Sequence, residues 1–111
     1  MGIKPGHKYL ELTAIGKAGI EPGIADEVLF DVLEEFPKGR AIQNWTTDWV
    51  RKGEEVTGAK HGFSCPEDLV DEFGKFAREF GEKRQVVVSM EVPEKQPNVL
   101  RGGPVVTASQ A

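Results

Sequence analysis

Hydrophobic residues along this chain switch repeatedly between a spacing of two and a spacing near 3.6, the periods of a strand and of a helix. The alternation over Lys8–Ile15 predicts a strand with one buried face. The helical spacing over 24–36 predicts an amphipathic helix, which Pro37 and Gly39 end. Because each pattern lasts for one short element, the chain must build strands and helices around a single core.

Residues 40–50 fit both periods. As a strand, this segment places Trp45 and Trp49 on one face; as a helix, it places them one turn apart. We prefer the strand, because threonine, valine and tryptophan favour pleated structure. Residues 52–54 are then a hairpin turn, and 55–63 return as a second strand that glycines weaken.

A run of helix-start signals follows at residues 64–68. Ser64 and Glu67 fit a capping box, in which each side chain satisfies a backbone N–H of the other residue. In the competing frame Cys65 is the N-cap and Pro66 the first helical residue. The helix then runs to Gly81, a natural C-terminal cap. Its apolar stripe consists of Leu69, Phe73, Phe76, Ala77 and Phe80.

Residues 84–92 alternate again and predict the last strand. The order strand, helix, strand, strand, helix, strand resembles the split βαβ arrangement of ferredoxin-like domains. This resemblance, which concerns the order of elements alone, implies an α+β fold with an antiparallel sheet and both helices on one face. We expect residues 1–7 to form a flexible lead-in, 8–92 a single domain, and 93–111 an extended tail containing proline and glycine.

Charge limits the partners of this domain. The 111 residues include 14 Lys plus Arg and 18 Asp plus Glu, a net charge of −4. Nucleic-acid binders need a basic surface to displace counterions, and anionic membranes attract basic segments. We therefore expect neither nucleic acid nor a membrane as partner.

Cys65 is the only cysteine, so the chain has no internal disulfide and nothing indicates an oxidising compartment. With no signal-peptide core and no apolar run long enough to span a bilayer, the expected location is the cytoplasm. The sequence lacks the spacings typical of metal sites and the glycine loops that hold phosphates. We therefore expect no metal and no cofactor.

The sheet face opposite the helices is the first candidate for function. The strand patterns place Tyr9, Trp45 and Trp49 there, and such an apolar patch on a small domain indicates a binding surface. The simplest partner is a second copy, which makes a homo-oligomer. Alternatively, the tryptophans face the helices and complete the core.

The second candidate is the first helix, because no Lys or Arg occurs from Ala18 to Pro37. Asp31, Glu34 and Glu35 would contact a basic partner, as in an acidic inhibitor. The alternative is an ordinary solvated helix face.

The third candidate pairs Cys65, at the predicted helix start, with His61. A helix N-terminus stabilises a thiolate, and a nearby histidine could act as its base. Such a pair implies an enzyme, or a ligand-binding protein with a pocket between sheet and helices. The alternative is a packing cysteine. Because no further catalytic group accompanies the pair, we expect a non-enzymatic binding or accessory protein.

Overall fold

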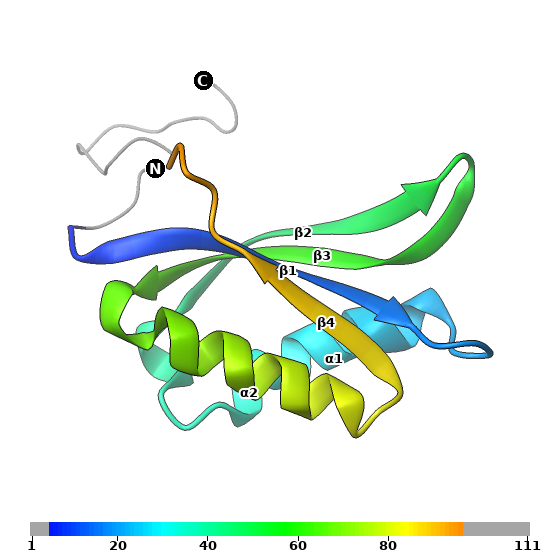
Figure 1. Ribbon diagram of the computed structural model, residues 1–111, viewed down its shortest axis with the longest axis horizontal. Helices are drawn as coiled ribbons and strands as arrows, with labels where there is room; N and C mark the ends of the chain where they lie inside the picture. The colour runs from blue at the N-terminus through cyan, green and yellow to red at the C-terminus, as the bar shows by residue number, and fades with distance from the viewer. Residues whose placement is uncertain (1–4, 97–111) are drawn as a thin grey trace.

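The computed structural model describes residues 5–96. It confirms the α+β class and the predicted order of elements (Figure 1). The elements are β1 (His7–Gly16), α1 (Pro22–Glu35), β2 (Gln43–Lys52), β3 (Glu55–Pro66), α2 (Val70–Glu82) and β4 (Val86–Glu91), with short 3₁₀ helices at Gly39–Ala41 and Glu67–Leu69. Expectations for residues 1–4 and 97–111 lie outside the described residues.

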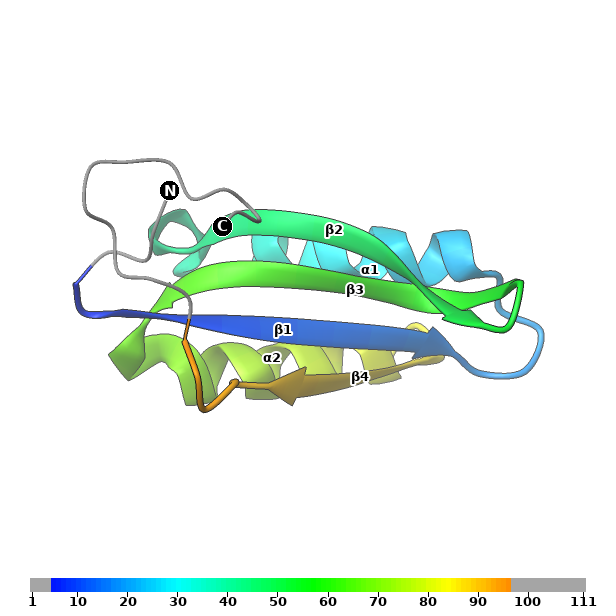
Figure 2. The same cartoon turned by 90° about the horizontal axis from the view of Figure 1, so that it is seen from above.

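The four strands form one sheet in the order β2-β3-β1-β4, and every neighbouring pair is antiparallel. β1 and β2 are therefore parallel to each other, with β3 between them. In the same way β1 lies between β3 and β4. Both helices lie on one side of the sheet, and Figure 2 views the strands from the other side. Among residues 5–96 no helix covers that second side, which we call the open face.

The core fills the space between the helices and the sheet. The alternation of β1 directs Leu10, Leu12 and Ala14 toward the helices, and all three are fully buried. The apolar stripe of α1 meets them, and Phe63 of β3 packs edge-on against Phe73 of α2 with ring centroids 5.3 Å apart. Close packing of large side chains here supplies most of the apolar burial that stabilises the fold.

The predicted start of the second helix is wrong by several residues. β3 continues to Pro66, and α2 begins only at Val70, with no side-chain cap. Ser64 lies within β3, buried and paired with β1, so the capping box does not form. The pairing of Ser64 with β1, which is distant in sequence, outweighs the local capping-box signal. Gly81 is also not a cap: it lies inside α2, where an added side chain would collide with Val88.

The predicted strand over 40–50 is confirmed as β2, but it carries a β-bulge between Asn44 and Thr46. The Asn44 amide donates hydrogen bonds to the carbonyls of Thr46 and Gly62, both at 3.2 Å. These bonds from Asn44 hold the backbone of the bulge, whose extra residue is Trp45, against the neighbouring strand β3. A bulge shifts the alternation of a strand by one residue, so side chains before and after it exchange faces.

The described residues beyond β4, up to Gln96, return to β1. β4 pairs with β1 only from Glu11 onward, which leaves the backbone of Tyr9 without a strand on that side. The Gln96 side chain fills this place: its Oε1 accepts from the Tyr9 N–H at 2.6 Å, and its Nε2 donates to the Tyr9 carbonyl at 3.1 Å. One side-chain amide thus substitutes for the missing strand. Within the described part of the chain, no helix is long and apolar enough to cross a membrane.

Candidate interaction surface

The strand register sorts the side chains of the open face into rows across the sheet, because directly opposed residues of antiparallel strands point to the same face. An aliphatic row lies at one end of the face and two polar rows lie in the middle. Aromatic side chains occupy the opposite end, which we call the aromatic end. The aliphatic row is Val50, Gly58, Ile15 and Val87; the polar rows are Asp48, Lys60, Thr13 and Ser89, then Thr46, Gly62, Glu11 and Glu91; the aromatic end is Tyr9 with Trp45, flanked by Gln43 and Ser64.

The aromatic end forms because Trp45 follows the alternation of Gln43, before the bulge, and so lies on the open face; the bulge shifts only the residues after it. Its ring lies 5.8 Å from that of Tyr9, tilted by 48°. Gly62 makes room for this pair, since a side chain at that position would collide with the Tyr9 hydroxyl and with Thr46. The Tyr9 hydroxyl donates to Glu11 at 2.9 Å, and burial is the main cause that raises the pKa of Tyr9 to about 12. The phenol therefore stays neutral and presents an uncharged aromatic surface.

The middle of the open face carries charges of both signs. Lys60 Nζ lies 3.9 Å from Glu11 Oε1, and both side chains are partly exposed. A pair of this kind contributes little to stability, because water screens it. With Asp48 and Glu91 in the same two rows, the centre of the face is polar and carries a net negative charge.

The aliphatic row carries smaller side chains than the aromatic end. Ile15 packs over Gly58, where an added side chain would collide with Ala14 and Ile15. Val87, on the edge strand β4, is 49% exposed. The open face therefore has large aromatic side chains at one end and smaller aliphatic side chains at the other.

Trp49 does not belong to this face, contrary to the prediction. It lies opposite Ala59, whose side chain is buried on the helix side of the sheet. The even spacing of the two tryptophans predicts a shared face, but the bulge separates them. Trp49 also does not complete the core: it is 43% exposed, because α1 packs mainly on β3 and β1 and leaves the edge strand β2 bare.

The acidic segment is less free of counter-charge than its sequence indicates. Arg84, far along the chain, lies 3.0 Å from Asp31. Asp26 is also engaged, since it accepts a hydrogen bond from His61 at 2.8 Å. Glu34 and Glu35 remain exposed. Of the three predicted contacts for a basic partner, one is therefore already in an ion pair.

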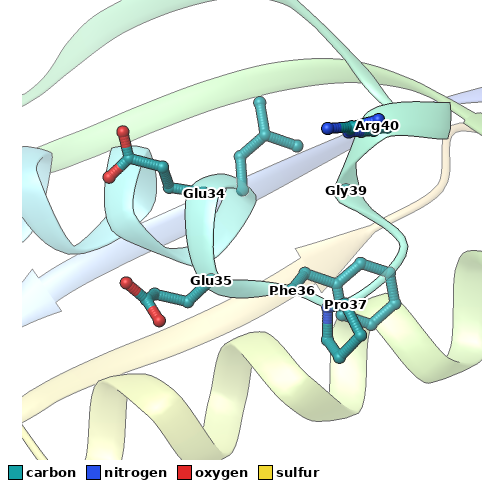
Figure 3. Close-up of a pocket in the computed structure, with 7 residues that line it drawn as sticks. Glu34, Glu35, Phe36, Pro37, Gly39 and Arg40 are labelled. Carbon is teal, nitrogen blue, oxygen red and sulfur yellow. The ribbon is translucent and has the colours of Figure 1, made fainter.

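Glu34 and Glu35 line an open cavity of about 430 Å³ at the C-terminal end of α1. Figure 3 shows the two carboxylates leaving the last turn in different directions, with Arg40 across the loop from them. The cavity lies beside the helix end, whereas the space between sheet and helices is filled by the core.

The structure contradicts the predicted pair of thiolate and base. Cys65 and His61 both lie in β3, four residues apart, which separates them by about 13 Å in a strand. Cys65 is fully buried, and burial, with a smaller contribution from Asp68, raises the pKa of its thiol to about 11. It is a packing residue near the end of a strand, with no helix N-terminus to stabilise a thiolate.

His61 instead links α1 to the sheet. Its Nε2 donates to Asp26 at 2.8 Å, and the Phe30 ring meets it edge-on at 4.6 Å. Across residues 5–96, no three His, Cys, Asp or Glu side chains gather closely enough to hold a metal ion.

No family model and no curated protein matches this sequence. Among solved structures, the chain is similar to a hydantoinase/carbamoylase family amidase from Burkholderia ambifaria, with a TM-score of 0.54 and 15% sequence identity. The match covers 86% of this chain and 29% of the amidase, so this chain spans less than a third of that enzyme's length. A likeness at this level of identity concerns the fold alone.

Proposed function

We propose that this protein is a small binding or accessory protein that acts through protein–protein contact on the open face of its sheet. The observation that carries the proposal is the Tyr9–Trp45 pair on a face that no described helix covers. Tyrosine and tryptophan are enriched in protein interfaces, where they dominate the binding energy. The covered face has already buried the aliphatic residues of β1, so these aromatics serve no core.

The edges of the sheet favour a partner on the face rather than on an edge. β2 is an edge strand with a bulge, and it carries the charges of Asp48, Arg51 and Lys52. Bulges and charges are features that protect edge strands from pairing with another chain. At the opposite edge β4 is short, only 6 residues, and Gln96 holds the backbone of Tyr9 where β4 has ended.

The proposal involves no catalytic step, since Cys65 is buried and His61 is bound to Asp26. We place this function in the cytoplasm, an environment that suits a single free cysteine.

A second candidate is docking of a basic partner at the end of α1. Glu34 and Glu35 favour it, because they are exposed where the negative end of the helix dipole adds to their charge. The probe is poly-lysine. Reversing both charges to lysine should weaken its binding and flatten the salt dependence, and unchanged salt dependence would exclude this candidate.

The main proposal is tested with the two tryptophans. Wild-type protein, Trp45→Ala and Trp49→Ala are each immobilised and exposed to the wild-type protein and to a cell extract. Whatever binds the wild type should bind Trp49→Ala equally and Trp45→Ala at least about tenfold more weakly. Circular dichroism and Tm confirm that both variants fold. Equal binding by all three proteins would contradict a role for the open face.

A further inference from the structure

We propose that the partner of the open face is a second copy of this chain, packed face to face with its strands running in the opposite direction. The aromatic end of each copy then covers the aliphatic row of the other. This inference rests on the proposed function and adds the identity and orientation of the partner. The two-fold axis crosses the strands near Leu12, midway between Tyr9 and Ile15.

The area of the open face is sufficient for such a dimer. Four strands spaced about 4.8 Å apart span about 19 Å, and a strand of 10 residues spans about 33 Å. Each copy therefore offers about 600 Å², or about 1,200 Å² for the pair, the lower end of the range for specific complexes. Paired sheets cross at about 30°, which leaves the central rows in closest contact.

The sizes of the side chains on the face favour opposite strand directions. Tyr9 and Trp45 are large and lie at one end, whereas the aliphatic row at the other end has a glycine, Gly58, at its centre. The two ends are six residues apart along β1, or about 20 Å. Opposite directions place the large aromatic side chains of one copy on the smaller aliphatic side chains of the other. A parallel arrangement would place aromatic on aromatic and leave a gap at the aliphatic row, and unfilled gaps forfeit packing contacts.

The two-fold rotation also brings opposite charges of the polar rows near each other. Glu11 and Lys60 lie on neighbouring strands on either side of the proposed axis. The rotation brings Lys60 of one copy toward Glu11 of the other, so positive and negative groups alternate around the axis. The remaining carboxylates of these rows, Asp48 and Glu91, lie on the edge strands β2 and β4, where water screens them, while the central Lys60–Glu11 pairs gain strength as the interface excludes water.

Sedimentation equilibrium tests whether the partner is a second copy. The wild-type protein should show a reversible monomer–dimer equilibrium in about the micromolar range, because its interface is small and polar at the centre. Trp45→Ala should raise the dimer dissociation constant at least about tenfold, and Trp49→Ala should leave it within about twofold. Val87→Lys gives an independent variant, since its exposed position makes the substitution tolerable to the fold. It should also weaken the dimer.

Cross-linking tests the orientation. Gln43 and Val50 lie at opposite ends of β2 on the open face, and the proposed axis brings each against the other in the second copy. Gln43→Cys and Val50→Cys are prepared separately, and buried Cys65 serves as the unreactive background. Under mild oxidation by copper phenanthroline, a mixture of the two variants should form a disulfide-linked heterodimer that neither variant forms alone. Homodimers in each separate sample, or no cross-link in a dimeric mixture, would overturn the orientation.

The outcomes separate this inference from the proposed function. A wild-type protein that stays monomeric at millimolar concentration overturns the second copy as partner. If, in that case, proteins from the extract still bind Trp49→Ala but not Trp45→Ala, the open face is a binding surface for a different protein. If the tryptophan variants behave alike in every assay, both the inference and the proposed function fail.

Discussion

Trp45 and Trp49 stand four residues apart in one strand, yet they lie on opposite faces of the sheet. Trp45 joins Tyr9 on the open face, and Trp49 lies on the helix side, beyond the reach of the core. A single bulged residue makes the difference. The comparison shows that, in a small domain, which face a large side chain occupies depends on local backbone irregularity as much as on its own chemistry.

The two faces of β1 differ in a related way. The covered face is made of aliphatic residues that are fully buried, whereas the open face alternates aromatic, charged and aliphatic positions. A core requires only apolar volume that packs well. A surface that remains soluble alone and still binds requires apolar ends with a polar centre. The two faces therefore contribute to different free energies, one to folding and the other to association.

The largest expected effect is on the covered face. Phe63→Ala removes a fully buried ring from the contact with α2 and should lower the free energy of unfolding by about 3–5 kcal/mol. Tyr9→Ala, on the open face of the neighbouring strand, should cost less than half as much in the monomer. Urea denaturation at low protein concentration measures both. Equal losses would show that the open face also belongs to the core.

Two carboxylates of α1 give the next comparison. Asp26→Ala leaves the buried Nε2–H of His61 without a partner and should destabilise the protein by about 1–3 kcal/mol. Asp31→Ala breaks an exposed pair with Arg84 and should cost less than about 1 kcal/mol. Thermal unfolding compares the two variants. A cost for Asp31→Ala as large as that for Asp26→Ala would contradict the distinction between buried and exposed partners.

The thiol of Cys65 predicts a loss of stability at high pH. Its pKa rises from 9.0 to about 11 on folding, so the folded state holds the proton more tightly. Below pH 9 the thiol is protonated in both states, and its contribution to the free energy of unfolding is complete. Between pH 9 and 11 the thiol ionises mainly in the unfolded state, so the free energy of unfolding falls by about 1–2 kcal/mol. Urea titrations across this range should show the decline. Cys65→Ala should lack this component, and an identical decline in that variant would refute it.

The elements themselves were predictable, because hydrophobic period reports which face of an element is buried. The helical spacing over 24–36 and the alternation of β1 and β4 arise only from the burial of one face of each element. The bulge in β2 was not predictable in this way. It depends on Asn44, whose amide bonds to two carbonyls that only the folded hairpin brings together.

The errors at the candidate sites have similar causes. The helix-start signals at 64–68 are local, and pairing of Ser64 with Tyr9 across the sheet replaced them. The acidic segment lacks counter-charge in sequence, but Arg84 reaches Asp31 from the other end of the domain. Each error concerns a contact between distant residues. A chain's own pattern carries no signal for such contacts, whereas the apolar faces were correctly assigned wherever the strands were regular.

The smallest expected effect on folding lies at the centre of the open face. Glu11→Gln removes the charge opposite Lys60 but keeps the size of the side chain, so the monomer should lose less than about 1 kcal/mol. In the proposed dimer the same charge recurs across the axis, next to the Lys60 of the other copy, and both copies lose it at once. Association should therefore weaken more than folding does, and its salt dependence should become shallower. Sedimentation at two ionic strengths, beside urea denaturation of the monomer, measures both quantities. A variant that loses folding stability but associates as the wild type does would place Glu11 outside the interface and leave only the aromatic and aliphatic ends to hold the two copies together.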